Sequence, residues 1–233
     1  MKNPNLSEII KGCFKGKSLV RTLTDLRCST IQLSGDGLDL GAKSGDSSYL
    51  SFFSIAPHTQ ITGTDLLPKD DEVIQVDLEK SIPIPSESQD FVLAMNVLEH
   101  VFHYKTCIQE SYRVLKTGGN IIGVVPFLKG YHPDPDDYFR FTASAINRIL
   151  EDTNFCEIEV ESLGFGPFTA GASQLAPFLK IKLSATLLWT VAIIMDRVLN
   201  ATFPKKLSTR PAMFSLGYFF IARKFPSEHE TIS

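Results

Sequence analysis

The sequence predicts an α/β fold with a largely parallel central sheet. Wholly apolar segments recur along the chain, and four of the first five end in Asp or Asn, at Asp39, Asp65, Asp77 and Asn96. Strands that are apolar throughout are typical of parallel sheets covered by helices on both faces. The carboxyl ends of such strands meet along one edge, where ligands bind. We therefore expect a Rossmann-like domain whose ligand site is built from these polar residues.

The first predicted strand runs into a glycine-punctuated turn, Gly37-Leu-Asp-Leu-Gly-Ala-Lys-Ser-Gly45. Glycines let backbone amides approach a ligand that a Cβ would exclude, and a helix expected to begin near Asp46 would point its N-terminus at the same spot. Asp39, at the end of the strand, is then an acceptor directed into the crevice. This spacing alone is weak evidence, because many α/β turns need glycine only for backbone geometry.

The segments that follow strengthen this interpretation. Asp65 lies at about the spacing at which a dinucleotide fold places the acid that binds ribose hydroxyls. A glycine turn, Thr117-Gly118-Gly119, precedes the fifth strand. The predicted strands after the first run over residues 61–64, 73–76, 91–95, 121–125, 157–163 and 217–223.

The chain divides into four predicted parts. Residues 1–30 are expected to form helices that pack over the ligand mouth, and residues 31–163 with 216–225 form the core. Thr142 is a predicted N-cap of a core helix that ends before Thr153-Asn154. Residues 164–215 form a helical insertion where this fold normally has a short hairpin, and residues 226–233 form a flexible tail.

Two motifs carry a resemblance to a known family. They are Asp90-Phe-Val-Leu-Ala-Met-Asn-Val-Leu-Glu-His-Val101 and Glu110-Ser-Tyr-Arg-Val-Leu-Lys-Thr-Gly-Gly119. From about Gly37 to Phe155, the chain resembles class I S-adenosylmethionine-dependent methyltransferases, in particular the group that includes ubiquinone-biosynthesis-like enzymes. The resemblance implies a seven-stranded sheet in which strands one to six are parallel and strand seven is antiparallel.

The resemblance also implies roles for individual residues around S-adenosylmethionine. Asp65 and the adjacent Leu66 would hold the ribose, and Lys43 departs from the family because a glycine usually stands there. The remaining assignments are Asp39, Gly41, Ala42 and Gly45 at the methionine end, Asp77 and Leu78 at the adenine, and Asn96 and Val97 along the wall formed by strand four. If Lys43 turns to solvent, binding is expected to survive with some loss; if it points inward, we expect the turn to be remodelled.

A proline-framed segment, Tyr131-His-Pro-Asp-Pro-Asp-Asp-Tyr-Phe-Arg-Phe-Thr142, follows the fifth strand. It resembles a methyltransferase subgroup that is often encoded with bacterial surface-glycan biosynthesis genes. Its two prolines stiffen the loop, so we predict substrate contacts by Asp137, Tyr138 and Arg140. The alternative is that Asp137 and Arg140 only pair with each other and stabilise the loop.

His100 and His132 are the candidate catalytic bases, because methyl transfer to a hydroxyl requires a group that accepts its proton. His100 alternatively caps the next helix and shapes the pocket wall. His103 could join His100 as a pair of metal ligands, but no third ligand follows at a recognisable spacing. The sequence therefore predicts no metal.

The insertion contains thirteen uncharged residues from Leu183 to Met195. A helix of that length rises about 20 Å, which is short of the roughly 30 Å hydrocarbon core of a bilayer. It is apolar on two sides: one carries Leu179, Leu183, Leu187, Val191, Ile194 and Val198, and the other Leu188, Trp189, Ala192 and Ile193. Either the whole helix is buried, or an outward face, for example one with Leu188, Trp189 and Ile193, meets a membrane surface, a second copy of the chain or a lipid-like substrate.

Composition excludes some classes of partner and indicates where the protein is located. The 23 basic and 26 acidic residues argue against a nucleic-acid partner bound through a basic face. The four cysteines form no C-x-x-C pair, and no apolar run of signal-peptide length precedes Lys11, so a cytoplasmic protein, with membrane association left open, is expected. The predicted function is methyl transfer from S-adenosylmethionine to a small-molecule or glycan hydroxyl, with a lipid-linked acceptor included. The alternative is a non-catalytic module that docks a partner through the insertion.

Overall fold

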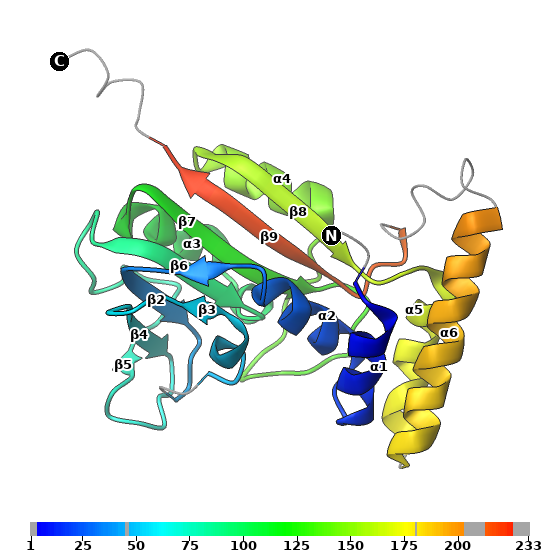
Figure 1. The fold of residues 1–233 in the computed structure, drawn as a ribbon. Coiled ribbons are helices and arrows are strands. Elements are labelled where there is room, and N and C mark those ends of the chain that lie inside the picture. The colour runs from blue at the N-terminus through cyan, green and yellow to red at the C-terminus, as the bar shows by residue number, and fades with distance from the viewer. Residues whose placement is uncertain (1–3, 45–46, 180, 203–212, 226–233) are drawn as a thin grey trace.

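The computed structural model describes residues 4–44, 47–179, 181–202 and 213–225 (Figure 1). Its centre is a seven-stranded sheet in the order β5-β4-β2-β6-β7-β9-β8. The strands are β2 (Asp36–Leu40), β4 (Gln60–Asp65), β5 (Ile74–Gln75), β6 (Gln89–Met95), β7 (Leu115–Pro126), β8 (Phe155–Leu163) and β9 (Gly217–Lys224). Neighbours from β5 to β7 pair in parallel, and β9 runs antiparallel to both β7 and β8. The prediction of a seven-stranded sheet with a reversed last strand is confirmed.

Three details of the predicted strands differ. The third strand shrinks to the two residues of β5, and an unpredicted two-stranded sheet pairs β1 (Gln32–Leu33) with β3 (Ser54–Ile55). The expected turn at Thr117-Gly118-Gly119 lies inside β7, where the pairing with β6 shifts register. Gly118 has φ +86°, a left-handed conformation that glycine adopts without strain, so an irregularity replaces the turn.

Helices cover both faces of the sheet (Figure 1). One face packs against α3 (Tyr104–Val114) and α4 (Ala143–Asp152), and the other against α1 (Leu6–Phe14), α2 (Leu19–Cys28), α5 (Pro167–Leu175) and α6 (Lys182–Thr202). Residues of β6 alternate between the two cores: Val92 and Ala94 face one, and Leu93 and Met95 face the other. The predicted cap is confirmed, because Thr142 Oγ1 accepts a hydrogen bond from Ala145 N at 3.1 Å. Near the N-terminus, α1 packs against α6.

The prediction of an α-helix directly after the glycine turn is wrong. Asp46 and Gly45 lie outside the described residues, and Ser47 to Tyr49 lead into a short 3-10 helix, η1 (Leu50–Phe52). Ser47 Oγ and Tyr49 Oη both donate hydrogen bonds to Asp39. These side-chain bonds hold the segment against the strand end and compete with a regular helix.

Among the described residues, the insertion contains α5, the 3-10 helix η3 (Ala176–Phe178) and α6. At 21 residues, α6 continues through Asp196, so the expectation of a helix too short to cross a bilayer is wrong. By length and composition α6 could cross a membrane, although core helices of soluble proteins pass the same test. In this structure α6 packs against α1 and α5 (Figure 1). The predicted tail, 226–233, lies outside the described residues.

The two apolar sides of α6 have different environments. The arrangement in which Leu188, Trp189 and Ile193 face outward is wrong, because Trp189 and Ile193 are 5% and 0% exposed and Leu188 packs against the same core. The opposite stripe faces solvent: its members within α6 are exposed, and so is the adjacent Met195, which gives the set Leu183, Leu187, Val191, Ile194, Met195 and Val198. We call these six residues the outer stripe.

Asp196 fixes this orientation. Its side chain is fully buried, and its carboxylate accepts bonds from Phe168 N at 3.0 Å and from Thr169 N and Oγ1 at 2.8 Å. The two amides belong to the first turn of α5, where helical N–H groups have no partner within the helix and the dipole favours a negative charge. The face of α6 that carries Asp196 must therefore lie against α5.

Replacing Asp196 by Ala is expected to destabilise the fold by roughly 3 kcal/mol, because two buried amides and a hydroxyl lose their acceptor. For a chain of this size, that corresponds to a fall in Tm of about 6–12 °C. The matched control is Asp152→Ala, which removes an exposed helical aspartate paired with Arg148. Thermal unfolding followed by circular dichroism measures both; equal Tm values for the two variants would contradict the anchoring role.

Candidate functional site

The polar residues predicted at the strand ends lie along one edge of the sheet. β5, β4, β2 and β6 are neighbours in that order, and Asp77, Asp65, Asp39 and Asn96 lie at or just beyond their carboxyl ends. The structure therefore brings together the four residues that the sequence placed in one crevice. Leu66, Val97 and Leu78 follow three of these residues directly.

Asp39 is held more tightly than the sequence indicated. Its side chain is almost completely buried, and it accepts hydrogen bonds from Ser47 Oγ at 2.8 Å and from Tyr49 Oη. Burial raises the pKa of Asp39 to about 6, and the two hydroxyl donors offset part of this rise. The sequence analysis missed Ser47 and Tyr49, because only the folded turn brings them to the strand end.

The backbone amides of the glycine turn were predicted to approach a ligand, but two of them bind the neighbouring strand. The amides of Gly41 and Ala42 both donate to the carbonyl oxygen of Thr64, at 2.7 and 2.9 Å, so they brace the turn against β4. Gly41 has φ +74°, and a Cβ there would lie 2.8 Å from Val97 Cγ2. Glycine is therefore required at position 41 by its conformation and by the close approach of Val97.

Lys43 points out of the turn. It has φ +47°, in the left-handed region that glycine adopts without strain, which accounts for the family's usual glycine at this position. Its Nζ pairs with the carboxylate of Asp134, a residue of the loop after β7. Lys43 thereby links the two sides of the crevice, and both side chains are about half exposed.

Asp65 already binds two backbone amides. Its Oδ2 accepts from Lys43 N at 3.2 Å and its Oδ1 accepts from Leu67 N at 2.8 Å. Each carboxylate oxygen has a further lone pair, so the residue can still accept bonds from a ligand.

Of the other residues predicted to bind the cofactor, some are exposed to solvent and one is buried in the core. Asn96 is exposed with φ +55°, and Leu66 is 43% exposed. Asp77 pairs with Lys80 at 3.0 Å, which helps to lower the pKa of Asp77. Leu78 instead packs in the core, so its side chain does not line the crevice.

The loop after β7 is built around a buried ion pair. The side chain of Asp137 is 1% exposed, and its two oxygens accept bonds from Arg140 Nη1 and Nη2 at 2.5 and 2.6 Å. Arg140 holds the pKa of Asp137 well below its usual range. The prediction that Asp137 contacts substrate directly is wrong, because both oxygens are occupied and enclosed; Asp137 positions its neighbours. Tyr138 is 44% exposed and donates to Asp136 at 3.0 Å.

His100 and His132 lie next to each other, with their ring centroids 5.2 Å apart. Between them is Glu99, whose side chain is fully buried. Its Oε1 lies 3.8 Å from His100 Nε2 and 3.7 Å from His132 Nε2. Burial raises the pKa of Glu99 to about 8 and lowers that of His132. The sequence analysis gave Glu99 no role, because a glutamate next to a histidine is not by itself a signal.

Two alternatives for the histidines are also resolved. His100 does not cap α3, because the cap position of that helix is His103. His103 lies 3.7 Å from Glu79 and points away from the cluster of Glu99, His100 and His132.

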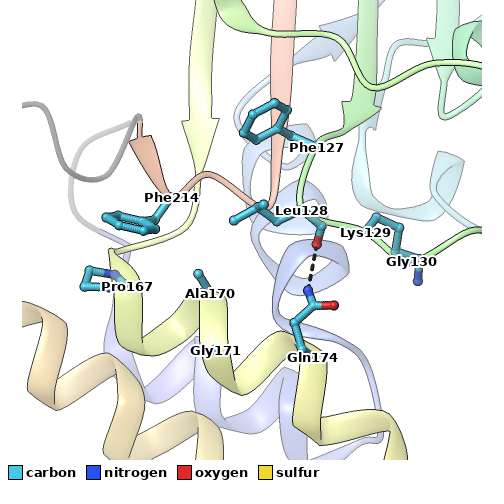
Figure 2. Close-up of a pocket in the computed structure, with 9 residues that line it drawn as sticks. All are labelled: Phe127, Leu128, Lys129, Gly130, Pro167, Ala170, Gly171, Gln174 and Phe214. Atoms are coloured by element: carbon cyan, nitrogen blue, oxygen red, sulfur yellow. Dashed lines mark hydrogen bonds between the residues drawn. The ribbon is translucent and has the colours of Figure 1, made fainter.

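A shallow pocket opens beside the same loop (Figure 2). One wall is the start of the loop after β7, from Phe127 to Gly130, and the other is α5. Gln174 Nε2 donates to Leu128 O at 3.2 Å across one end of the pocket. Most of the lining is apolar: it also includes Pro167, Ala170, Gly171 and Phe214.

Residues 38–123 match the family model described as "Methyltransferase domain". This part of the chain is therefore similar to methyltransferase domains. The match begins on β2 and ends in β7, so it contains all the strand-end acids. No curated protein matches the chain.

Solved structures support the same fold. The chain is 18% identical to a phosphoethanolamine N-methyltransferase 2 of Haemonchus contortus, solved with phosphomonomethylethanolamine and S-adenosylhomocysteine, at a TM-score of 0.53; the match covers 88% of this chain and 52% of that protein. A SAM-dependent methyltransferase of Archaeoglobus fulgidus is 18% identical, with a TM-score of 0.57 and coverage of 92% and 97%. The [4+2]-cyclase SpnF is 21% identical, with a TM-score of 0.54 and coverage of 89% and 82%. The fold thus occurs with more than one reaction.

The crevice fits S-adenosylmethionine by the chemistry of its polar groups. Asp65 retains lone pairs for ribose hydroxyls, Asp77 and Asn96 are accessible, and the anionic edge suits a ligand that carries an ammonium and a sulfonium charge. The charge of Lys43 is paired with the carboxylate of Asp134. A phosphoethanolamine N-methyltransferase 2 of Haemonchus contortus, one of the structural neighbours, was solved with S-adenosyl-L-methionine.

Asp39 makes a pH-dependent contribution to stability. Its pKa in the fold is about 6, above the unfolded value near 3.8, so the folded state binds more protons between these pH values and its stability falls as the pH rises through them. Asp39→Asn cannot ionise, and it is expected to remove a fall on the order of 2–3 kcal/mol between about pH 4 and pH 7.

Urea unfolding of the unliganded protein across this range measures the difference. Asp36→Asn is the control, because Asp36 begins the same strand and its side chain is 54% exposed. A pH slope for Asp39→Asn equal to that of the wild type would show that Asp39 is ionised throughout.

Proposed function

We propose that the protein transfers a methyl group from S-adenosylmethionine to a hydroxyl of a small-molecule or glycan acceptor, including one carried on a lipid. The observation that supports this most is the position of the cluster of Glu99, His100 and His132, which adjoins the acids of the cofactor edge. Glu99 and His100 follow β6 four and five residues after Met95, and His132 belongs to the loop after β7.

Bound S-adenosylmethionine supplies an activated methyl group, so the chain has only to position the acceptor oxygen and receive its proton. Asp65, Asp77 and Asn96 would hold the cofactor. His100 and His132 are proposed to lie beside the acceptor hydroxyl, and Tyr138 and Arg140 to contact the acceptor from the loop.

The pocket in Figure 2 is proposed to hold the apolar part of the acceptor. It begins at Phe127, directly after β7, and its opposite wall is α5. An apolar lining with few polar groups is typical of a site for hydrocarbon. This favours a lipid-linked acceptor over a free sugar.

Asp65→Ala is expected to weaken S-adenosylmethionine binding about 30-fold, because two ribose hydroxyls lose an acceptor worth roughly 1 kcal/mol each. Isothermal titration calorimetry measures the affinity, and Asp71→Ala, an exposed acid nearby, is the control. Failure of the wild-type protein to bind S-adenosylmethionine or S-adenosylhomocysteine at millimolar concentration would refute the proposed function.

We further propose that the outer stripe of α6 meets the surface of an anionic membrane. The stripe continues past the start of α6 into Ile181 and Phe178, which are 67% and 82% exposed. Lys182 begins the helix, and Gly16 at the end of α1 lies against its side chain, which brings the exposed Lys11 and Lys15 to the same end. An apolar stripe with basic residues beside it is typical of helices that lie in the membrane interface.

The variant Leu183→Ser, Leu187→Ser, Val191→Ser is expected to lose flotation with vesicles that contain phosphatidylserine while keeping the wild-type Tm, because the three side chains are exposed. A control variant replaces Ile55 and Phe225, exposed apolar residues away from α6, by Ser. Flotation of the wild type is expected to weaken with added salt. Concentration-dependent dimerisation without vesicle binding would assign the stripe to a second copy of the chain instead.

A further inference from the structure

The side chain of Glu99 stands out because nothing in the described part of the chain satisfies it. It is fully buried, and neither carboxylate oxygen has a hydrogen-bond partner among the described residues. Its nearest charged neighbours, Arg140 and Asp137, form an ion pair with each other, so Arg140 is not free to neutralise it. An unpartnered buried carboxylate is costly unless it takes up a proton, toward which the raised pKa of Glu99 tends, or a cation joins it.

Both histidines direct the same ring nitrogen at Glu99. His100 Nδ1 lies 2.5 Å from the carbonyl oxygen of Asp136, and His132 Nδ1 lies 3.0 Å from that of Gly130. A carbonyl only accepts, so each Nδ1 carries the proton and each Nε2 presents a lone pair. The two Nε2 atoms are those that lie 3.7 and 3.8 Å from Glu99 Oε1.

Arg140 does not disturb this assignment. Its Nη2 lies 3.3 Å from His132 Nδ1, but Nη2 also lies 2.6 Å from Asp137 Oδ2 and 3.2 Å from Gly130 O. These two acceptors use both Nη2 protons. Histidines that ligate metals characteristically donate their second N–H to a backbone carbonyl or a carboxylate, and His100 and His132 have that arrangement.

We propose that Glu99, His100 and His132 bind a divalent first-row transition metal ion, for which Zn²⁺ is the natural probe. The three ligand atoms lie within 4.8 Å of one another. Ligand atoms around a tetrahedral zinc ion are about 3.3 Å apart, so small side-chain rotations close the site. Two imidazole nitrogens and one carboxylate favour such an ion over Mg²⁺ or Ca²⁺, which prefer oxygen ligands.

The site has room for further ligands on its outer side. Glu99 closes the inner side, whereas the side chains of His100 and His132 are 13% and 33% exposed. Three protein ligands leave at least one coordination position open, as in catalytic metal sites. An acceptor hydroxyl bound there would lose its proton to water more readily, because the metal lowers its pKa. This role rests on the proposed methyl transfer, whereas binding of the metal does not.

The direct test is calorimetric titration of the chelator-treated full chain with Zn²⁺, in the absence of cofactor and acceptor. The wild type is expected to bind one equivalent, and Co²⁺ to produce visible absorption bands of a nitrogen and oxygen site. Glu99→Gln and His132→Ala are each expected to weaken binding on the order of a hundredfold or more. His103→Ala is the matched control, because His103 lies nearby but outside the cluster.

Glu99→Gln separates loss of the ligand from loss of the fold, because it keeps the shape of the side chain and removes only a buried charge. Its Tm without metal is expected to equal or exceed that of the wild type, and its rise in Tm with Zn²⁺ to disappear. Absence of a stoichiometric Zn²⁺ site in the wild type, or equal affinity in His132→Ala, would overturn the proposal.

Removal of the metal with a chelator tests whether the metal takes part in catalysis. Removal of the metal is expected to abolish turnover and to leave S-adenosylmethionine affinity unchanged. Full turnover after chelation would overturn the catalytic role of the metal and leave the histidines as bases. Loss of cofactor binding in the untreated protein would instead count against the proposed function.

Discussion

The architecture depends on the burial of the central strands on both faces. Such strands place polar groups mainly near their ends, and the carboxyl ends of the central strands meet along the edge at which ligands bind. Asp39, Asp65, Asp77 and Asn96 are there because the strands that carry them are neighbours. The loop after β7 then folds back over this edge, and the backbone of Glu99 holds it by accepting bonds from Tyr138 N and Phe139 N.

Four buried carboxylates show how the fold compensates negative charge. Asp39 receives two hydroxyl donors, Asp196 receives two amides and a hydroxyl, and Asp137 receives the guanidinium of Arg140. Each of these contacts holds a local structure: the turn after β2, the packing of α5 on α6, and the loop after β7. Glu99 differs, because the described residues offer it only two imidazole nitrogens at more than hydrogen-bond distance. The carboxylate of Glu99 lacks a partner of opposite charge, and a bound cation would supply one.

The insertion forms both the outer stripe, through α6, and one wall of the pocket, through α5. One face of α6 packs through Trp189 and Ile193, and α5 lies between α6 and the loop after β7. The apolar pocket of Figure 2 is bounded by α5, and the outer stripe lies on the far side of the same insertion.

The sequence by itself determined the sheet and its ligand edge, because strand periodicity and polar strand ends are local properties. It also identified the cap at Thr142 and the acids that lie at the strand ends. Three features were decided only by tertiary contacts. The segment after Gly41 does not form the expected helix, because Ser47 and Tyr49 bind Asp39. The outer stripe of α6 faces solvent because Asp196 binds α5, although both sides of α6 are apolar. Glu99 lies next to His132 because the loop after β7 returns to the end of β6. Each depends on residues distant in sequence or on competition between equally apolar faces, which no local pattern can resolve.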